Sequence, residues 1–206
     1  MKHALLPLGL ACALLATPGC MDRTQLVDTD NDHEIVAGLD YKDFEAAAVE
    51  TTQAILSSGK VRNATADASK LYVVSIGKVS DETPLSIDTD LITARIGESL
   101  LADERFEISA VFADRESNMD TTVSEARTVR GNAEFDQSTV QGAGQLKAPD
   151  FSLTGKIVAR DVKRDNGGHQ YEYYFQLRMN AIATGTTLMM KETKVIKRTG
   201  KKSHTW

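Results

Sequence analysis

The residue types that most often carry out chemistry are scarce in this chain and are poorly placed for it. The 206-residue sequence has four histidines, at positions 3, 33, 169 and 204, and two cysteines, at positions 12 and 20. No pair of these residues has the spacing of a zinc site, and no Gly-x-Ser-x-Gly motif marks a serine nucleophile. We therefore expect no metal, no cofactor and no enzymatic activity.

The cysteine at position 20 follows a short apolar segment. Lys2 precedes an apolar run over residues 4–16, which is shorter than the roughly 20 residues that a membrane-spanning helix requires. The sequence Ala-Thr-Pro-Gly-Cys at 16–20 resembles the cleavage box of bacterial lipoproteins, in which the cysteine becomes the acylated first residue. We predict a signal peptide over residues 1–19 and lipid attachment at Cys20. A secreted protein with a free thiol is the alternative, and such a thiol is a liability outside the cytoplasm.

The composition predicts one folded domain behind this segment. Hydrophobic residues make up 41% of the chain, too many for a disordered protein, and the length allows one sizeable core. The net charge of −5 argues against a nucleic-acid partner, because counterion release requires a basic surface. Residues 22–50 contain nine acidic and two basic residues, whereas residues 191–206 contain six basic and one acidic. The basic end either keeps the protein soluble or binds a partner.

The segment between the cysteine and the domain is short. Residues 21–38 are polar and acidic, contain no proline and lack sustained periodicity. We predict a flexible tether over residues 20–38 and a globular domain over residues 39–206. Such a tether spans roughly 60–65 Å when fully extended and about 25 Å as a flexible coil. We therefore expect the domain to stay near the membrane that carries it.

The first half of the domain alternates between helices and strands. A helix is expected from a cap at Asp40 to a stop at Gly59. A second helix is expected after a cap at Asp88 or Thr89, because apolar residues recur there every four positions, at 92, 96 and 100. The other elements expected here are a buried strand over 71–79, a strand over 106–112 and a weak helix over 121–135.

The second half of the domain changes to a period of two. Strands are expected over 151–160, 171–179 and 187–197, with turns at 165–168 and at Thr184-Gly185. On the middle strand, Tyr173 and Phe175 lie on the apolar face. We predict an α+β fold, with a small mixed sheet that ends in an antiparallel meander and packs with about three to four helices.

Several stretches of the domain are specific in combination. They are Phe-Ser-Leu-Thr-Gly-Lys-Ile-Val-Ala-Arg at 151–160, Asp-Asn-Gly at 165–167, Tyr-Glu-Tyr-Tyr-Phe-Gln-Leu at 171–177, Lys-Val-Ile-Lys-Arg at 194–198, Gly-Leu-Asp-Tyr-Lys-Asp-Phe at 38–44, Leu-Ser-Ser-Gly at 56–59 and Ile-Asp-Thr-Asp-Leu at 87–91. Together they resemble the LpoB family. The resemblance implies a domain like the N-terminal domain of the translocation protein TolB. It also implies a non-enzymatic outer-membrane lipoprotein that faces the periplasm and activates a bifunctional penicillin-binding protein.

Two other function classes remain open. An assembly or secretion lipoprotein of related fold, such as the curli secretion pore family, needs hairpins long enough to span a membrane, and the polar segments 114–122 and 136–150 are not of that kind. A small-ligand-binding lipoprotein needs a compact cluster of polar residues around a deep pocket.

An activator without a catalytic pocket must act by binding, so we predict a docking surface. The C-terminal hairpins carry Arg and Tyr side chains at their tips and edges, and these types are enriched at interface hot spots. We expect a monomer to dock through this surface onto the penicillin-binding protein. The predicted partner-binding residues are Arg160, Asp165, Asn166, Tyr174, Arg178, Lys197 and Arg198.

Overall fold

The computed structural model describes residues 40–112, 120–165 and 167–199. The predicted signal peptide, Cys20 and the predicted tether lie outside the described residues. The described part belongs to one compact unit, Val36–Trp206. None of its helices combines the length and the apolar character needed to cross a membrane.

A five-stranded mixed sheet forms the centre of this unit. Its strands are β1 (Tyr72–Glu82), β2 (Phe106–Ile108), β3 (Phe151–Lys163), β4 (His169–Ala181) and β5 (Thr186–Thr199). Their order in the sheet is β2-β1-β3-β4-β5. β1 runs parallel to both β2 and β3, whereas β3, β4 and β5 are antiparallel. The predicted α+β class and the C-terminal antiparallel meander are therefore confirmed.

Glycines make the two turns of the meander possible. Gly167, between β3 and β4, has a φ of 78°, and Gly185, between β4 and β5, has a φ of 65°. Residues with a side chain rarely adopt a positive φ, so these positions favour glycine. The tight turns place β3 beside β4 and β4 beside β5 along nearly their whole lengths.

The described residues form four helices. They are α1 (Tyr41–Leu56), α2 (Gly59–Ala64), α3 (Thr89–Leu101) and α4 (Thr121–Thr128). Asp40 caps α1 by accepting the backbone N–H of Asp43 at 3.0 Å, and the Asp43 carboxylate accepts the N–H of Asp40 in return. Asp88 caps α3 by accepting the N–H of Asp90. Both predicted caps are therefore confirmed.

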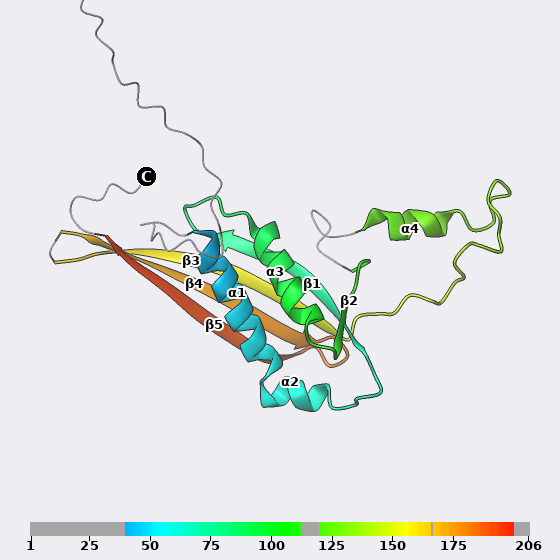
Figure 1. Cartoon of the computed structure of the whole chain (residues 1–206), viewed down its shortest axis with the longest axis horizontal. Helices are drawn as coiled ribbons and strands as arrows, with labels where there is room; N and C mark the ends of the chain where they lie inside the picture. Colours follow the sequence, from blue (N-terminus) through cyan, green and yellow to red (C-terminus); the bar gives the residue numbers. More distant parts are fainter. Residues whose placement is uncertain (1–39, 113–119, 166, 200–206) are drawn as a thin grey trace, which may run out of the picture. The chain divides into compact units, whose positions relative to one another are not determined.

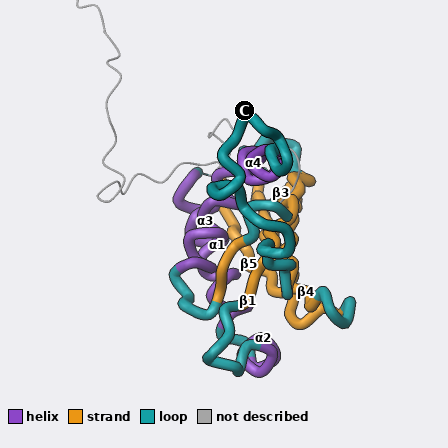
Figure 2. The backbone as a smooth tube through the Cα atoms, turned by 90° about the vertical axis from the view of Figure 1, so that its right-hand side faces the viewer, coloured by secondary structure: helices purple, strands orange, loops and turns teal. Residues whose placement is uncertain are grey.

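Helices α1 and α3 lie side by side across one face of the sheet (Figures 1 and 2). α1 contacts β4 and β5, and α3 contacts β1 and β2. The core forms between these two layers because every second strand side chain points toward the helices. Its largest fully buried apolar side chains are Ile55, Val61, Val74, Val79, Ile96, Leu100, Leu153, Ile157, Leu177 and Met179.

The chain forms one helix that the sequence does not predict. The sequence predicts that Gly59 ends the first helix, whereas Gly59 is the first residue of α2. Ser58 caps α2 by accepting the N–H of Val61 at 3.4 Å, and Val61 is fully buried. A cap and one buried anchor therefore suffice for this short helix.

Two elements are shorter than predicted. The strand expected over 106–112 ends at Ile108, because the Ser109 hydroxyl then accepts the N–H groups of Val111 and Phe112 in a turn. The helix expected over 121–135 ends at Thr128 and buries none of its residues. α4 thus adds nothing to the core.

Candidate partner-binding surface

The face of the sheet that α1 and α3 leave uncovered presents the polar residues of the meander. Successive strand residues point to opposite faces, so these residues alternate with the core residues. The register places Lys156 of β3 beside Gln176 of β4, which in turn lies beside Glu192 of β5. The open face is defined here by Ser152, Thr154, Lys156, Val158, Arg160, Glu172, Tyr174, Gln176, Arg178, Asn180, Met190, Glu192, Lys194, Ile196 and Arg198.

Basic and apolar side chains are interleaved on the open face. Its cations outnumber its carboxylates, since Glu172 and Glu192 stand against Lys156, Arg160, Arg178, Lys194 and Arg198. Met190 and Ile196 are 56% and 49% exposed among them. A mixture of Arg, Tyr and exposed apolar side chains is typical of protein interfaces, and the excess of cations suits an acidic partner surface.

The Glu172 carboxylate binds several side chains at the end of the open face near the turn between β3 and β4. It accepts hydrogen bonds from the Tyr174 hydroxyl and the Gln170 side-chain amide, both at 2.6 Å. The hydrogen bond from Tyr174 and then that from Gln170 hold the pKa of Glu172 below its usual value. The same bond to Glu172 raises the pKa of Tyr174. Lys194 Nζ lies over the Tyr174 ring, 5.3 Å from its centre, so Tyr174 contacts a carboxylate through its hydroxyl and a cation through its ring.

A small hollow opens beside Arg178 on the open face. It has a volume of about 150 Å³ and is lined by Lys156, Gly155, Arg178 and Met190 among others. The Arg178 guanidinium lies 3.7 Å from the Met190 sulfur. A concave spot with a mobile thioether and an exposed guanidinium is suited to receive a partner side chain.

The structure brings four of the predicted partner-binding residues together. Arg160, Tyr174, Arg178 and Arg198 all lie on the open face, and the three arginines are exposed. Arg198 donates to the Gln170 side chain at 2.8 Å, which links it to the hydrogen bonds around Glu172.

The other three predicted residues do not lie on this face. Asp165 is exposed in the turn after β3, and Asn166 lies outside the described residues. Lys197 points to the helix-covered side, where its ammonium lies 2.5 Å from Asp43 and 3.5 Å from Asp40. Its side chain is only 13% exposed. Lys197 therefore does not share the face of Arg198, because neighbouring residues of one strand point to opposite faces.

Sequence reasoning missed several members of the open face. Lys156 on β3 and Met190, Lys194 and Ile196 on β5 share the face with the predicted arginines. Alternate residues of a strand point to the same face, so Lys194 and Ile196 could have been predicted to share the face of Arg198. The signal was therefore present along β5, but the residue types alone do not show it.

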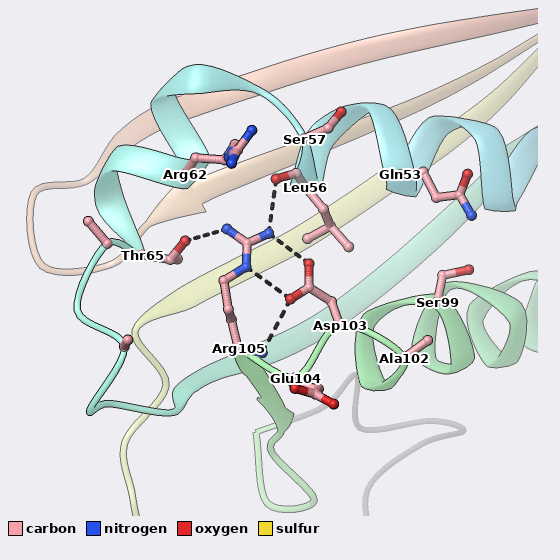
Figure 3. A pocket seen from close by; sticks show the side chains of 12 residues that line it. Gln53, Leu56, Ser57, Arg62, Thr65, Ser99, Ala102, Asp103, Glu104 and Arg105 are labelled. Carbon is pink, nitrogen blue, oxygen red and sulfur yellow. Dashed lines mark hydrogen bonds and ion pairs between the residues drawn. The ribbon is translucent and has the colours of Figure 1, made fainter.

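Another pocket among the described residues lies elsewhere, and polar side chains at its centre already bind one another. It has a volume of about 840 Å³ and opens between α1, α2 and the turn before β2. Figure 3 shows Arg105 at its centre, donating to both Asp103 carboxylate oxygens, to the Thr65 hydroxyl and to the Leu56 carbonyl. Hydrogen bonds from Arg105 lower the pKa of Asp103, although burial acts against them. Arg105 thus ties three segments together and has its charge balanced by Asp103.

The described residues hold no cluster of metal ligands, and the serines of their two Ser-x-x-Lys sequences are bonded to backbone carbonyls. They include no group of three or more His, Cys, Asp or Glu side chains that could hold a metal ion. Two Ser-x-x-Lys sequences, at 57–60 and 75–78, have the spacing of a serine nucleophile and its base. The Ser57 and Ser75 hydroxyls donate instead to the backbone carbonyls of Ala54 and Phe112.

Comparison with known structures finds distant matches. The LpoB C-terminal domain from Salmonella enterica is 13% identical, with 74% of this chain and 98% of that chain covered and a TM-score of 0.44. The NMR structure of E. coli LpoB is 13% identical, with 94% and 91% covered and a TM-score of 0.41. Lipoprotein GNA1162 from Neisseria meningitidis is 11% identical, with 62% and 83% covered and a TM-score of 0.34.

Comparison of the sequence itself decides the family. No curated protein matches the sequence. Residues 43–195 match the family model described as peptidoglycan-synthase activator LpoB. Because this match extends over well more than half of the chain, the protein belongs to the LpoB family of peptidoglycan-synthase activators, which are not enzymes and stimulate a bifunctional penicillin-binding protein.

Proposed function

We propose that the open face is the surface through which this activator binds its bifunctional penicillin-binding protein. The observation that carries the proposal is the gathering of Arg160, Tyr174, Arg178 and Arg198 on one sheet face that α1 and α3 leave free. The hydrogen bonds around Glu172 hold Tyr174 and, through Gln170, Arg198 in place before binding, which lowers the entropy that binding costs.

Activation then follows from a difference in affinity. A bound protein stimulates an enzyme when it binds the active arrangement more tightly than the resting one. A tenfold difference, about 1.4 kcal/mol, changes the ratio of the two arrangements tenfold. The open face supplies this difference if its arginines meet carboxylates that come together only in the active synthase. We propose that the activator binds as a monomer. The described sheet and helices form their core within a single chain, so a second copy is not needed to complete the fold.

Charge reversal on the open face tests this proposal. The double variant Arg160→Glu, Arg178→Glu is expected to lose about 2 kcal/mol of binding free energy, which is about 30-fold in Kd for the synthase. The free energy of unfolding should change by less than about 1 kcal/mol, because both side chains are exposed. Binding is measured with the purified synthase, and stimulation is measured as glycan polymerisation.

The matched control reverses two exposed charges away from the open face. Lys60→Glu with Arg62→Glu on α2 makes the same change in net charge. This control should bind and stimulate as the parent does. If Arg160→Glu, Arg178→Glu stays folded and still stimulates the synthase fully, the docking surface lies elsewhere.

The LpoB family consists of outer-membrane lipoproteins, and we extend the proposal to the anchor of this chain. Cys20 carries the lipid, and the domain faces the periplasm at the end of a short tether. Cys20→Ser should remove the mass of the acyl groups and release the protein from the outer-membrane fraction, because one attached chain buries about 0.8 kcal/mol per methylene. Cys12→Ser, inside the predicted signal peptide, is the control and should leave the mature protein unchanged. An unaltered mass and location of the Cys20→Ser protein would contradict the assignment.

A further inference from the structure

A groove of about 700 Å³ lies on the helix-covered side of the domain. Its walls are the first turn of α1, the connection from β1 to α3, and α3 itself. α1 and α3 lie side by side at this place (Figure 1). The open face shares none of its residues with this groove, so the proposed synthase contact leaves it unexplained.

Large apolar side chains exposed to water gather in the groove. Leu91 is 65% exposed, Tyr41 is 40% exposed and Leu85 is 37% exposed. Phe44 and Ile87 lie half-buried beside them. Single exposed apolar residues are ordinary, but several around one concave site mark a binding surface.

The rim of the groove is acidic. Its charged lining residues are the carboxylates of Asp40, Glu45, Asp88 and Glu98 and the guanidinium of Arg95. Arg95 is held between Glu45 and Glu98, with an N–O distance of 2.6 Å to each. Arg95 is thus already shared by two carboxylates, and even with Lys197 beside Asp40 the four rim carboxylates outnumber the two cations. A fitting occupant combines apolar side chains with basic ones.

The end of β5 lies beside this rim. Lys197 Nζ lies 3.5 Å from the carboxylate of Asp40, which is itself a groove residue. Residues 200–206, with the sequence Gly-Lys-Lys-Ser-His-Thr-Trp, follow β5 directly. A segment of this length reaches roughly 25 Å when extended, which is ample for a groove that begins next to Lys197.

We propose that the chain's own segment 200–206 occupies the groove. Lys201 and Lys202 lie against the acidic rim, and the Trp206 ring lies among Tyr41, Leu85 and Leu91. The segment contains both basic side chains, which complement the acidic rim, and an aromatic side chain, which complements the apolar lining. Its attachment to β5 gives it a high effective concentration at the groove. Segment 200–206 thus covers the exposed apolar side chains of the groove.

The single tryptophan of the chain reports directly on this contact. Trp206 is the only tryptophan in the sequence, so emission excited selectively at the indole, at wavelengths that tyrosine does not absorb, reports on this residue. With the full chain, we expect blue-shifted emission and protection from acrylamide quenching. Urea should abolish both signals when the domain unfolds. These readouts need no synthase, so their outcome is independent of the proposed docking surface.

A pair of double variants tests whether the groove causes the protection. Leu85→Ser with Leu91→Ser removes the apolar wall of the groove. This double variant is expected to lower the ratio of groove-bound to unbound segment 200–206 about tenfold, equivalent to about 1.4 kcal/mol. The control, Leu71→Ser with Leu101→Ser, removes two leucines that are 47% and 58% exposed outside the groove. It should keep Trp206 protected.

A third variant tests the basic residues of the segment. Lys201→Glu with Lys202→Glu should expose Trp206 to the quencher, because the acidic rim then repels the segment. The proposal is overturned if Trp206 is quenched as freely in the native protein as in urea. It is also overturned if the groove double variant leaves Trp206 protected, or if protection depends on protein concentration, which would indicate a second copy as the occupant.

Discussion

Replacement of Phe175 by alanine is expected to lower the free energy of unfolding by about 3–5 kcal/mol. The Phe175 side chain is 3% exposed and lies on the helix-facing side of β4, the strand that is paired on both edges by β3 and β5. Its register partners are Ile157 on β3 and Thr193 on β5, and both are buried. Removal of the ring leaves a cavity that two paired strands and the helix above them cannot close.

Urea denaturation of the purified protein, followed by far-UV circular dichroism, measures this loss. Gln176→Ala is the matched control, because Gln176 is the next residue of β4 and points to the open face. Its side-chain amide bonds Glu192 at 2.7 Å, so its loss should cost only about 1 kcal/mol or less. A Phe175→Ala loss below about 1 kcal/mol would mean that the two faces of β4 are assigned the wrong way round.

Substitution of Gly155 by alanine is expected to cost about 3 kcal/mol, at the upper end of the usual range for overpacking. A Cβ atom at this position would lie 2.6 Å from Leu177 Cδ2 and 2.9 Å from the backbone oxygen of Gln176. Leu177 is fully buried and cannot rotate freely, and the Gln176 oxygen belongs to the paired strand β4. The strands must therefore separate locally to admit a single methyl group.

The control for this substitution is a glycine-to-alanine change at an exposed position. Gly59 begins α2, and a Cβ atom there meets nothing within 4 Å. Gly59→Ala should leave stability unchanged or raise it by about 0.5–1 kcal/mol, because alanine restricts the unfolded chain. If Gly155→Ala is as stable as Gly59→Ala in the same urea titration, β3 and β4 are not as closely paired as the register requires.

These two substitutions complement the charge reversal on the open face. Phe175→Ala and Gly155→Ala weaken the sheet that presents the docking residues, so activation is lost together with stability. Arg160→Glu with Arg178→Glu leaves the sheet intact and removes only the contacts. A comparison of activation with unfolding free energy across the three proteins therefore separates the docking surface from the scaffold beneath it.

Local patterns in the sequence determined much of the fold. The alternation through Tyr173, Phe175 and Leu177 predicted both faces of β4, and the recurrence of Ile92 and Ile96 predicted the buried stripe of α3. A strand repeats every two residues and a helix every 3.6, so a single buried face leaves a periodic signature in the sequence. The two antiparallel hairpins followed equally from their turn residues, and the motif stretches together indicated the LpoB family that the family model confirms.

Other features depend on residues that are far apart in the chain, and only the tertiary structure decided them. The Lys197 side chain meets Asp40 and Asp43 because α1 crosses β5, although more than 150 residues separate them. The groove exists because the first turn of α1 packs beside the residues around Leu85 and Leu91. The β2-β1-β3 part of the sheet likewise joins strands through long connections. Periodicity reports which side of an element is buried, but it carries no record of the element on which that side packs.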